Sequence, residues 1–497
     1  MRGSAPVLPS WWTRALPWRV LLAVGLVTGA TARLWLAFTD HGLYWPDEVF
    51  QSLEPAHRMA FGYSMVAWEF VVGARNVLLP GAIALVLETL SALKLDDPFI
   101  YVPVVRVLFA LSSVGTVWGV YRLSRATGCS LPSAVVGTLA FAWMSLAIYF
   151  SPRAMSEVAS ALPVTWGLAL LLEAPSRKKL LLGASLLGLA VILRIHCGLF
   201  AAGAVVMLLA QRRRRDALVV FAVLCGWAVV YGLLDLFSWG SFLHSGISYL
   251  RFNLIEGRAA EWGTAPPAFY TKYLLKSLGP HWVVIAVLAV LGLRRSPAVV
   301  GLALAFLLGH LAMPHKELRF IVPFLPLVCA GAAAGVEQLL SWRWQAGAAA
   351  VASLLITSVF SFATFHTLTF EQLGRFDGVS AYDSGGPVTR LLMVAGRRAD
   401  LCGLGLSSSA RIETFAYFAL HRDVPLYEAP LPDEATHFYN YVIVEEGTPT
   451  GEVVAVDHGA ALVRLNLGPC ERDASFTPWL DDRTRTLAAS PESRFRP

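Results

Sequence analysis

Long apolar stretches recur along most of this chain, and a helix needs about 20 consecutive apolar residues to span the hydrocarbon core of a bilayer. Of the 497 residues, 56% are hydrophobic and only 15% are charged. The stretches are too many and too long for the core of a soluble domain. The pattern therefore predicts an all-α polytopic membrane protein.

The apolar stretches predict about eleven transmembrane helices, several of them shorter than a usual span. Their approximate positions are residues 20–38, 100–121, 131–150, 158–174, 180–194, 197–211, 217–234, 281–293, 297–312, 320–340 and 345–365. A further apolar stretch at 77–93 lies inside a polar loop and is more typical of a re-entrant or interfacial helix. If that stretch crosses the bilayer, the orientation of every later segment inverts.

Basic residues cluster at the ends of the apolar stretches, so the net charge of +6 indicates membrane topology and no nucleic-acid partner. The first stretch follows Arg14 and Arg19 and lacks a small-residue cleavage site, which predicts an uncleaved anchor with a cytoplasmic N-terminus. The loops at 39–99 and 235–280 and the C-terminus then face outward. The excess of Ala, Leu and Arg favours a bacterial inner membrane, with these loops facing the periplasm or the exterior; in a eukaryote the endoplasmic reticulum membrane is expected.

The composition changes after residue 365, where the apolar stretches end. Residues 1–365 are predicted to form the multispanning domain. Residues 366–497 are predicted to form a small extracytoplasmic α/β domain, because 439–444 and 453–456 have the pattern of strands between turn residues.

The six cysteines show no metal-ligand spacing, and the sequence predicts no metal site and no cofactor. Cys402 and Cys470 both lie in the outer domain. In an oxidising compartment they would pair, and the alternative is two buried free thiols.

Two adjacent carboxylates, Asp47 and Glu48, follow the first span directly in the first outer loop. Neighbouring residues of a helix or strand point apart, so we expect one to act as a general base and the other to be structural. The alternative is that Asp47 caps a helix beginning at Glu48, because Pro46 suits such an entry.

A second outward segment, 151–157, offers Arg153 and Glu157 at the outer boundary. These residues are candidates for binding a substrate. The alternative is an ordinary helix start with Ser151 or Ser156 as its cap.

The third outward loop, 235–280, is long for a compact membrane protein, and such loops are usually functional or mobile. It contains Asn253 and Tyr270. An amide and an aromatic hydroxyl suit contact with a sugar or a phosphate, and the alternative is a solvated connector.

The fourth segment, around His315, sets several polar residues against an apolar run at the outer boundary, where charge usually marks function. On a helix, His315, Lys316 and Arg319 would share a face. Two permanent cations there fit a lipid-linked phosphate, which Arg grips through two oxygens and Lys attracts as a point charge. Snorkelling toward headgroups is the alternative. Arg194, beside a turn within the membrane, is a further candidate for an anionic ligand.

These segments together resemble a known family. The run that begins at His315 is similar to the signature of glycosyltransferase family 22, the dolichyl-phosphate-mannose-dependent mannosyltransferases of GPI-anchor and N-glycan assembly. That signature usually begins His-Lys-Glu-Glu-Arg-Phe, and Leu318 replaces its second Glu. The first outer loop, the segment 151–157 and the loop around Asn253 resemble further family motifs in the same order, over about residues 18–340.

The resemblance implies a C-type glycosyltransferase (GT-C) architecture with its site on the non-cytoplasmic face. It implies inverting transfer of mannose, or another hexose, from a polyprenyl-phosphate sugar donor to a glycan or glycolipid acceptor at the membrane lipid. Carried over by position, Asp47 would be the catalytic base, and His315, Lys316 and Arg319 would lie near the donor phosphate. The acceptor and the sugar stay open. No Asp-x-Asp motif is present, so these cations would replace a metal ion and activity would survive EDTA.

A transporter or flippase of a lipid-linked sugar, without transferase activity, is the alternative function. Such proteins usually show paired repeats or broken helices near the midplane of the bilayer. The chain shows no convincing internal repeat, and its polar residues gather at one face. Retention of Asp47 and of the cationic segment also argues against a scaffold without catalysis.

Overall fold

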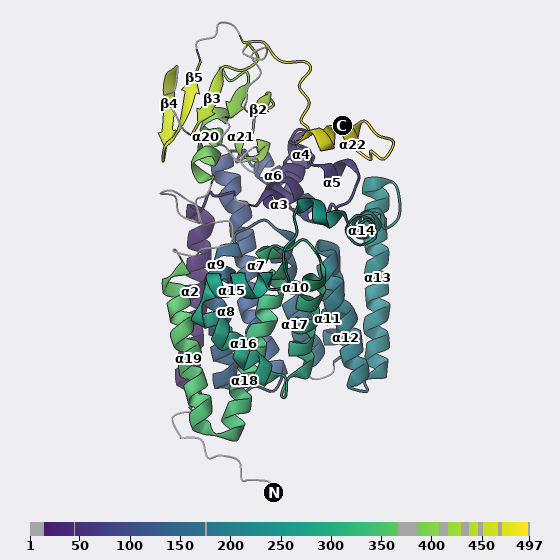
Figure 1. Ribbon diagram of the computed structural model, residues 1–497, viewed down its shortest axis with the longest axis vertical. Coiled ribbons are helices and arrows are strands. Elements are labelled where there is room, and N and C mark those ends of the chain that lie inside the picture. Colours follow the sequence, from purple (N-terminus) through teal and green to yellow (C-terminus); the bar gives the residue numbers. More distant parts are fainter. Residues whose placement is uncertain are drawn as a thin grey trace. The chain divides into compact units, whose positions relative to one another are not determined.

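The computed structural model describes residues 14–43, 45–173, 176–365, 385–406, 416–428, 437–445, 451–465 and 470–495. The chain forms two compact units, each made of two separate stretches. The first unit comprises Met1–Leu36 and Leu108–Gly374, and the second comprises Ala37–Val107 and Arg375–Pro497. Helices α2 (Ala15–Thr39) and α7 (Pro98–Ala126) continue from one unit into the other (Figure 1).

All regular secondary structure in the described part of the first unit is helical. Besides the portions of α2 and α7, it contains α8 (Leu131–Ala142), α9 (Ser145–Phe150), α10 (Ser156–Leu172), α11 (Arg177–Leu193), η2 (Ile195–Cys197), α12 (Gly198–Ala210), α13 (Arg214–Trp239), α14 (His244–Leu250), η3 (Arg251–Ile255), η4 (Arg258–Trp262), α15 (Phe269–Leu278), α16 (Pro280–Gly292), α17 (Pro297–Ala312), η5 (Leu318–Phe324), α18 (Leu325–Trp342) and α19 (Trp344–Ala363).

The described part of every predicted span is helical, with the span at 131–150 divided between two helices, which confirms the polytopic helical fold. Among the described residues, five helices are long and apolar enough to cross a bilayer by length and composition, namely α2, α7, α13, the continuous η5–α18 stretch and α19. Shorter apolar helices account for most of the remaining predicted spans. The stretch predicted at 77–93 is also helical, as α6 (Leu78–Ala92).

Helix α18 forms the centre of the first unit because small residues let its neighbours approach closely. It packs against α8 and α16. A Cβ atom on Gly335 would lie 1.9 Å from the carbonyl oxygen of Leu288 in α16, and one on Gly137 in α8 would lie 2.6 Å from the Cβ of Ala333. In contrast, α13 exposes large apolar side chains such as Phe237, as expected for a helix that faces lipid.

The span predicted at 131–150 is divided into α8 and α9 by a break after Ala142. A break inside a membrane leaves carbonyl groups that need a donor. Arg33 of α2 provides it, because its buried guanidinium donates to the carbonyl oxygens of Phe141 at 3.3 Å and Ala142 at 2.7 Å, and to Ser113 Oγ at 3.0 Å.

The second unit contains the first outer loop and the C-terminal part of the chain. From the loop come α3 (Pro46–Glu48), the π-helix η1 (Val49–Leu53), α4 (Glu54–Phe61), α5 (Trp68–Val71) and α6. The C-terminal part contributes α20 (Gly386–Gly396), β1 (Leu404–Leu406), α21 (Tyr417–Leu420), β2 (Leu426–Glu428), β3 (Tyr441–Val444), β4 (Glu452–Asp457), β5 (Ala460–Arg464) and α22 (Asp482–Ala488).

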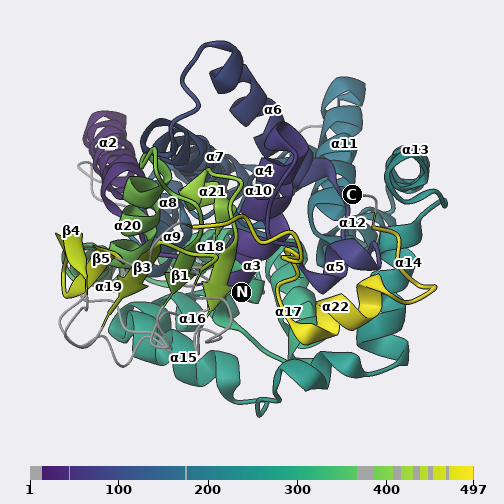
Figure 2. The ribbon, with the colours of Figure 1, turned by 90° about the horizontal axis from the view of Figure 1, so that it is seen from above.

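The five strands form one mixed sheet in the order β2-β1-β3-β5-β4. Strand β1 pairs in parallel with β2 and β3, whereas β3, β5 and β4 pair antiparallel. The hairpin between β4 and β5 turns at His458 and Gly459, both at positive φ, as a two-residue type I′ turn requires. Helix α20 packs against the sheet (Figure 2). The small C-terminal sheet predicted from the strand patterns is therefore present.

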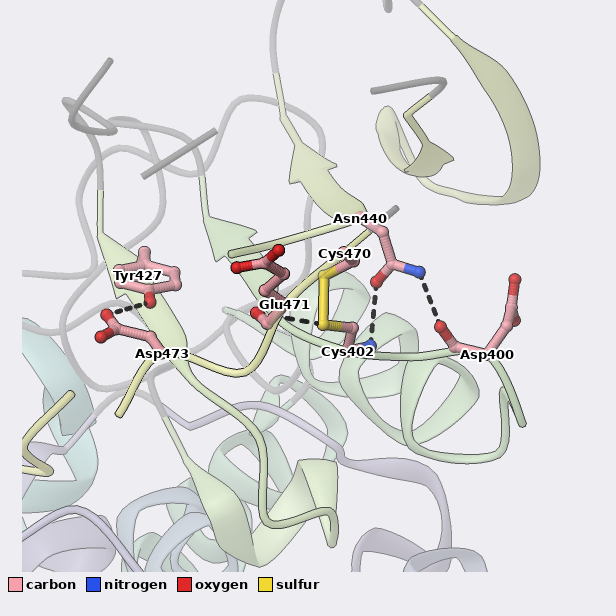
Figure 3. The surroundings of a disulfide bond; sticks show 7 residues. All are labelled: Asp400, Cys402, Tyr427, Asn440, Cys470, Glu471 and Asp473. Carbon is pink, nitrogen blue, oxygen red and sulfur yellow. Dashed lines mark hydrogen bonds between the residues drawn. A yellow bond between two sulfur atoms is a disulfide. The ribbon is translucent and has the colours of Figure 1, made fainter. Parts of the chain in front are cut away.

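Cys402 and Cys470 form a disulfide, with their Cα atoms 6.1 Å apart (Figure 3). Of the two alternatives that the sequence left open, pairing is the one that the structure shows. The bond joins the residue two positions before β1 to the segment that leads into α22.

Candidate active site

Asp47 lies in α3, a single helical turn whose first residue is Pro46. Proline suits the first helical position because its fixed φ is already helical and its missing N–H would have no partner there. The N-cap position is Trp45, and no side chain caps the turn. Asp47 is therefore not a helix cap, and that alternative interpretation is wrong.

The two adjacent carboxylates have different environments. The side chain of Asp47 is 24% exposed, whereas Glu48 is fully buried. The guanidinium Nη2 of Arg75 lies 3.9 Å from Asp47 Oδ2. Directly after Glu48 the chain forms the π-helix η1, a feature that is frequent at functional sites. Of the two carboxylates, Asp47 is the one that solvent or a substrate can reach.

Glu69 is a third carboxylate of this region, and the sequence analysis did not select it as a site residue. Gln51 Nε2 donates a hydrogen bond to Glu69 Oε1 at 2.9 Å. Burial raises the pKa of Glu69 to about 7, with the charge of Arg75 opposing this shift and that of Asp47 adding to it. Glu69 thus belongs electrostatically to the environment of Asp47.

Glu54 and His57 of α4 connect the first loop to the C-terminal part of the same unit. Glu54 accepts hydrogen bonds from the backbone N–H groups of Met65 and Phe418, both at 2.6 Å, while burial raises its pKa to about 8. His57 Nε2 lies 2.9 Å from His421 Nδ1. Burial lowers the pKa of His57 to about 3, so this histidine is neutral. These contacts are long-range, and no local pattern of the sequence indicates them.

In the first unit, three of the candidate residues form one buried charge cluster. Glu157 Oε1 accepts from Arg194 Nη1 at 2.7 Å and from Arg319 Nη1 at 2.9 Å. The three side chains are each at most 4% exposed. Helix α10 has Met155 at its N-cap and no side-chain cap, so Ser151 and Ser156 do not cap it.

The cluster continues to the residues of the family signature. Arg319 Nε donates to Glu317 Oε2 at 2.7 Å, and His315 Nε2 lies 2.9 Å from Glu317 Oε1. His315 Nδ1 lies 3.1 Å from the carbonyl oxygen of Gly263. Both neighbours of the imidazole are acceptors, so the protonated ring, which donates from both nitrogens, suits this position. Burial lowers the pKa of His315, but the hydrogen bond and the charge of Glu317, together with the Gly263 carbonyl, outweigh burial and raise it.

The expectation of a shared helical face is wrong for this segment. Residues 313–317 are not helical, and η5 begins only at Leu318. Lys316 turns away and its Nζ donates to the carbonyl oxygens of Met313 and, at 2.9 Å, of Ala265. Together with the Ala265 N–H bond to the Pro314 carbonyl at 3.0 Å, this contact docks the third outer loop on the segment. This segment pairs with the other loop and does not form a helix.

The remaining candidates differ in how they are held. Arg153 is buried with its Cζ 4.7 Å from the ring centroid of Tyr149. Asn253 donates to the carbonyl oxygen of Tyr249 at 2.9 Å within its own helical segment. Within the described part of the chain, the buried hydroxyl of Tyr270 and the Nε and Nη2 atoms of Arg194 have no hydrogen-bond partner.

Phe320 organises the cluster and was not selected from the sequence. The Cζ atoms of Arg194 and Arg319 lie over its ring, 5.3 and 4.7 Å from the centroid. The structure thus brings Glu157, Arg194, Arg319 and His315 into one hydrogen-bonded cluster. Asp47 and Glu48 belong to the second unit.

Residues 26–376 match the model of the Alg9-like mannosyltransferase family. The chain belongs to this family. The resemblance seen in the sequence is thereby confirmed, and with it the prediction of a membrane glycosyltransferase.

Two relatives illustrate the range of the match. GPI mannosyltransferase 3 of Yarrowia lipolytica is 29% identical over 354 residues, which cover 69% of each chain. A Dol-P-Man:Man(7)GlcNAc(2)-PP-Dol alpha-1,6-mannosyltransferase of Drosophila melanogaster is 30% identical over 138 residues, covering 27% of this chain and 20% of the relative. The chain spans less than two thirds of the length of several matched animal and plant mannosyltransferases.

The fold is similar to that of solved GT-C enzymes. ArnT from Cupriavidus metallidurans, in a crystal structure bound to undecaprenyl phosphate, aligns with a TM-score of 0.60 at 13% sequence identity. The alignment covers 92% of this chain and 100% of that chain. The predicted GT-C architecture is therefore confirmed.

Proposed function

We propose that this family member transfers mannose, or another hexose, from a polyprenyl-phosphate sugar donor to a glycan or lipid-linked acceptor on the non-cytoplasmic face. The donor class is supported by the Drosophila relative, whose name specifies Dol-P-Man. The outward facing is supported by the basic clusters that mark the opposite ends of the spans.

The observation that carries the proposal is the charge cluster around Arg194 and Arg319. Buried cations normally have all of their N–H groups paired. The Nε and Nη2 atoms of Arg194 are buried without a partner among the described residues, and so is the Tyr270 hydroxyl. Phosphate oxygens are the acceptors that a guanidinium fork and a hydroxyl suit best. We assign these groups, with Arg319 and His315, to the donor phosphate.

Asp47 is assigned the role of general base. Its carboxylate takes the proton of the acceptor hydroxyl as that oxygen bonds to the anomeric carbon of the sugar. The bond between the anomeric carbon and the phosphate oxygen breaks on the opposite face, so the configuration inverts. The polyprenyl phosphate leaves with the electron pair, and the cations stabilise its charge. The proposal uses no metal ion.

Transfer of radiolabelled hexose from a polyprenyl-phosphate donor in membranes tests this function. We expect Asp47→Asn to reduce transfer at least about 100-fold, because an amide cannot accept the proton. Glu88→Gln, an exposed carboxylate of α6, is the matched control and should retain normal transfer. Full activity of Asp47→Asn would exclude Asp47 as the base.

The same assay separates the enzyme from a flippase. A flippase would move the labelled donor across the membrane and leave it chemically intact. A transferase gives labelled product and free polyprenyl phosphate in equal amounts. Family membership favours the enzyme.

A further inference from the structure

Residues 470–495, which we name the C-terminal strap, are fixed at one end to the sheet of the second unit. Cys470 is bonded to Cys402 next to β1. The hydroxyl of Tyr427 in β2 donates to Asp473 Oδ2 at 2.6 Å (Figure 3). The Tyr427 ring lies edge-on to the Phe476 ring, with centroids 5.6 Å apart. The first part of the strap is therefore held by a covalent bond and by the edge strand.

The other part of the strap pairs with the first outer loop. The N–H of Val66 donates to the Pro478 carbonyl at 2.8 Å, and the N–H of Leu480 donates to the Val66 carbonyl at 3.1 Å, which forms a parallel β-bridge. The N–H of Arg494 donates to the Val71 carbonyl at 2.6 Å. Backbone hydrogen bonds thus hold the strap to both ends of the segment 66–71.

Side chains reinforce this pairing. The Cζ atom of Arg483 in α22 lies 4.8 Å from the ring centroid of Trp68. The Phe495 ring packs edge-on against the Trp479 ring, with centroids 5.1 Å apart. The Cζ atom of Arg58 in α4 lies 4.7 Å from the Phe495 ring centroid.

Two series of contacts connect the segment 66–71 to Asp47. Glu69 of this segment accepts a hydrogen bond from Gln51. Gln51 lies in η1, which directly follows α3 with Asp47. The carbonyl of Glu69 accepts from the N–H of Ala74 at 2.7 Å, and the next residue, Arg75, has its Nη2 3.9 Å from Asp47 Oδ2. Displacement of the segment would therefore move Arg75 beside the carboxylate and, through Gln51, the helical stretch that follows Asp47.

We propose that the C-terminal strap positions the general base, and that the Cys402–Cys470 disulfide makes this positioning dependent on the redox state. The strap fixes the segment 66–71. Through Arg75, and through the hydrogen bond between Glu69 and Gln51 of the helical stretch that follows Asp47, it fixes the orientation of the Asp47 carboxylate. This inference rests on the proposed function, because it takes Asp47 as the base. Reduction of the disulfide removes the covalent bond between the strap and the sheet and leaves only the contacts with Tyr427, so the strap holds the segment 66–71 less firmly.

Point variants of the full chain test whether the strap holds the segment 66–71 in place. We expect Arg483→Ala to lower kcat about 10- to 100-fold with the KM for the donor unchanged, because a small displacement of a base slows chemistry without weakening donor binding. Amide hydrogen exchange of residues 66–71 should become faster. Arg483→Lys, which keeps a cation for Trp68, should recover part of kcat. Arg485→Ala on the same helix is the matched control, because Arg485 is exposed and pairs only locally with Asp482 at 3.3 Å.

A reductant tests the role of the Cys402–Cys470 disulfide. Dithiothreitol should speed amide exchange at 470–480 and lower kcat, and the double variant Cys402→Ser with Cys470→Ser should show both effects without reductant and no further response to it. If the double variant keeps the wild-type kcat, the redox dependence is refuted.

Exchange and turnover together separate the two proposals. If Asp47→Asn retains turnover, the proposed function fails, whereas exchange at 66–71 still reports whether Arg483 holds the segment. If Arg483→Ala speeds exchange but leaves kcat unchanged, the strap holds the loop without positioning the base, and the inference is overturned. Unchanged exchange in Arg483→Ala overturns it as well.

Discussion

Phe320 is the residue that places two like charges side by side. Arg194 and Arg319 both lie over its ring and both donate to the same oxygen of Glu157. The negative face of the ring and the shared carboxylate offset the repulsion between the guanidinium groups. A donor phosphate that enters this cluster would meet two cations whose orientation is already set.

The role of Phe320 can be measured by replacing its ring. We expect Phe320→Leu to raise the KM for the donor about tenfold with a smaller change in kcat, because the loss of cation–π contacts of about 1 kcal/mol each loosens both arginines. Phe320→Tyr should restore the KM. Phe324→Leu is the control, since Phe324 is equally an aromatic residue of η5 but is buried against Trp282. A normal KM in Phe320→Leu would contradict the assignment.

His315 gives the cluster a dependence on pH. Because its pKa is raised in the folded protein, the protonated form contributes stability in full below the unfolded pKa of about 6.5. That contribution is lost as the pH rises through the raised value. We expect the Tm of the wild type in detergent to fall between pH 6 and pH 9, and that of His315→Gln to fall less. Parallel curves for the two proteins would show that the contact with Glu317 adds no stability.

At the scale of elements, close packing of helices rests on glycines. Gly335 of α18 has no room for a side chain, because its Cβ would lie 1.9 Å from a backbone oxygen of α16. Backbone atoms cannot rotate away as a side chain does, so the helices must separate.

Substitution of glycine by alanine should therefore affect the stability of the protein differently in two helices. We expect Gly335→Ala to lower the free energy of unfolding by at least about 2 kcal/mol, measured as a loss of Tm in detergent. Gly226→Ala in α13 is the control, because nothing lies within 4 Å of its added Cβ, and it should be neutral or slightly stabilising. Equal effects would mean that α16 and α18 do not pack as described.

At the scale of the whole molecule, the orientation in the membrane fixes which chemistry is accessible. The proposal places the first outer loop on the non-cytoplasmic side, because the basic clusters mark the other side. The exposed residues Ala92, at the end of α6, and Gln211, directly after α12, lie on opposite sides in this topology.

Cysteine labelling in intact cells tests that orientation. In a background with Cys225→Ser, which removes an exposed native thiol, we expect Ala92→Cys to react with a membrane-impermeant maleimide. Gln211→Cys should react only after the membrane is opened. The reverse result would place Asp47 in the cytoplasm and exclude the proposed site.

The sequence by itself determined the helical membrane fold, the family and the presence of a small C-terminal sheet. These follow from local patterns, since apolar length sets a span, alternation sets a strand such as β3, and the run from His315 carries the signature. The tertiary structure decided which polar residues act together. Glu157 meets Arg194 and Arg319 from distant parts of the chain, Lys316 leaves the expected helical face for a carbonyl of another loop, and Val66 pairs with the strap more than 400 residues later. Such contacts depend on how helices pack and on which buried polar groups need partners, and no local periodicity records either.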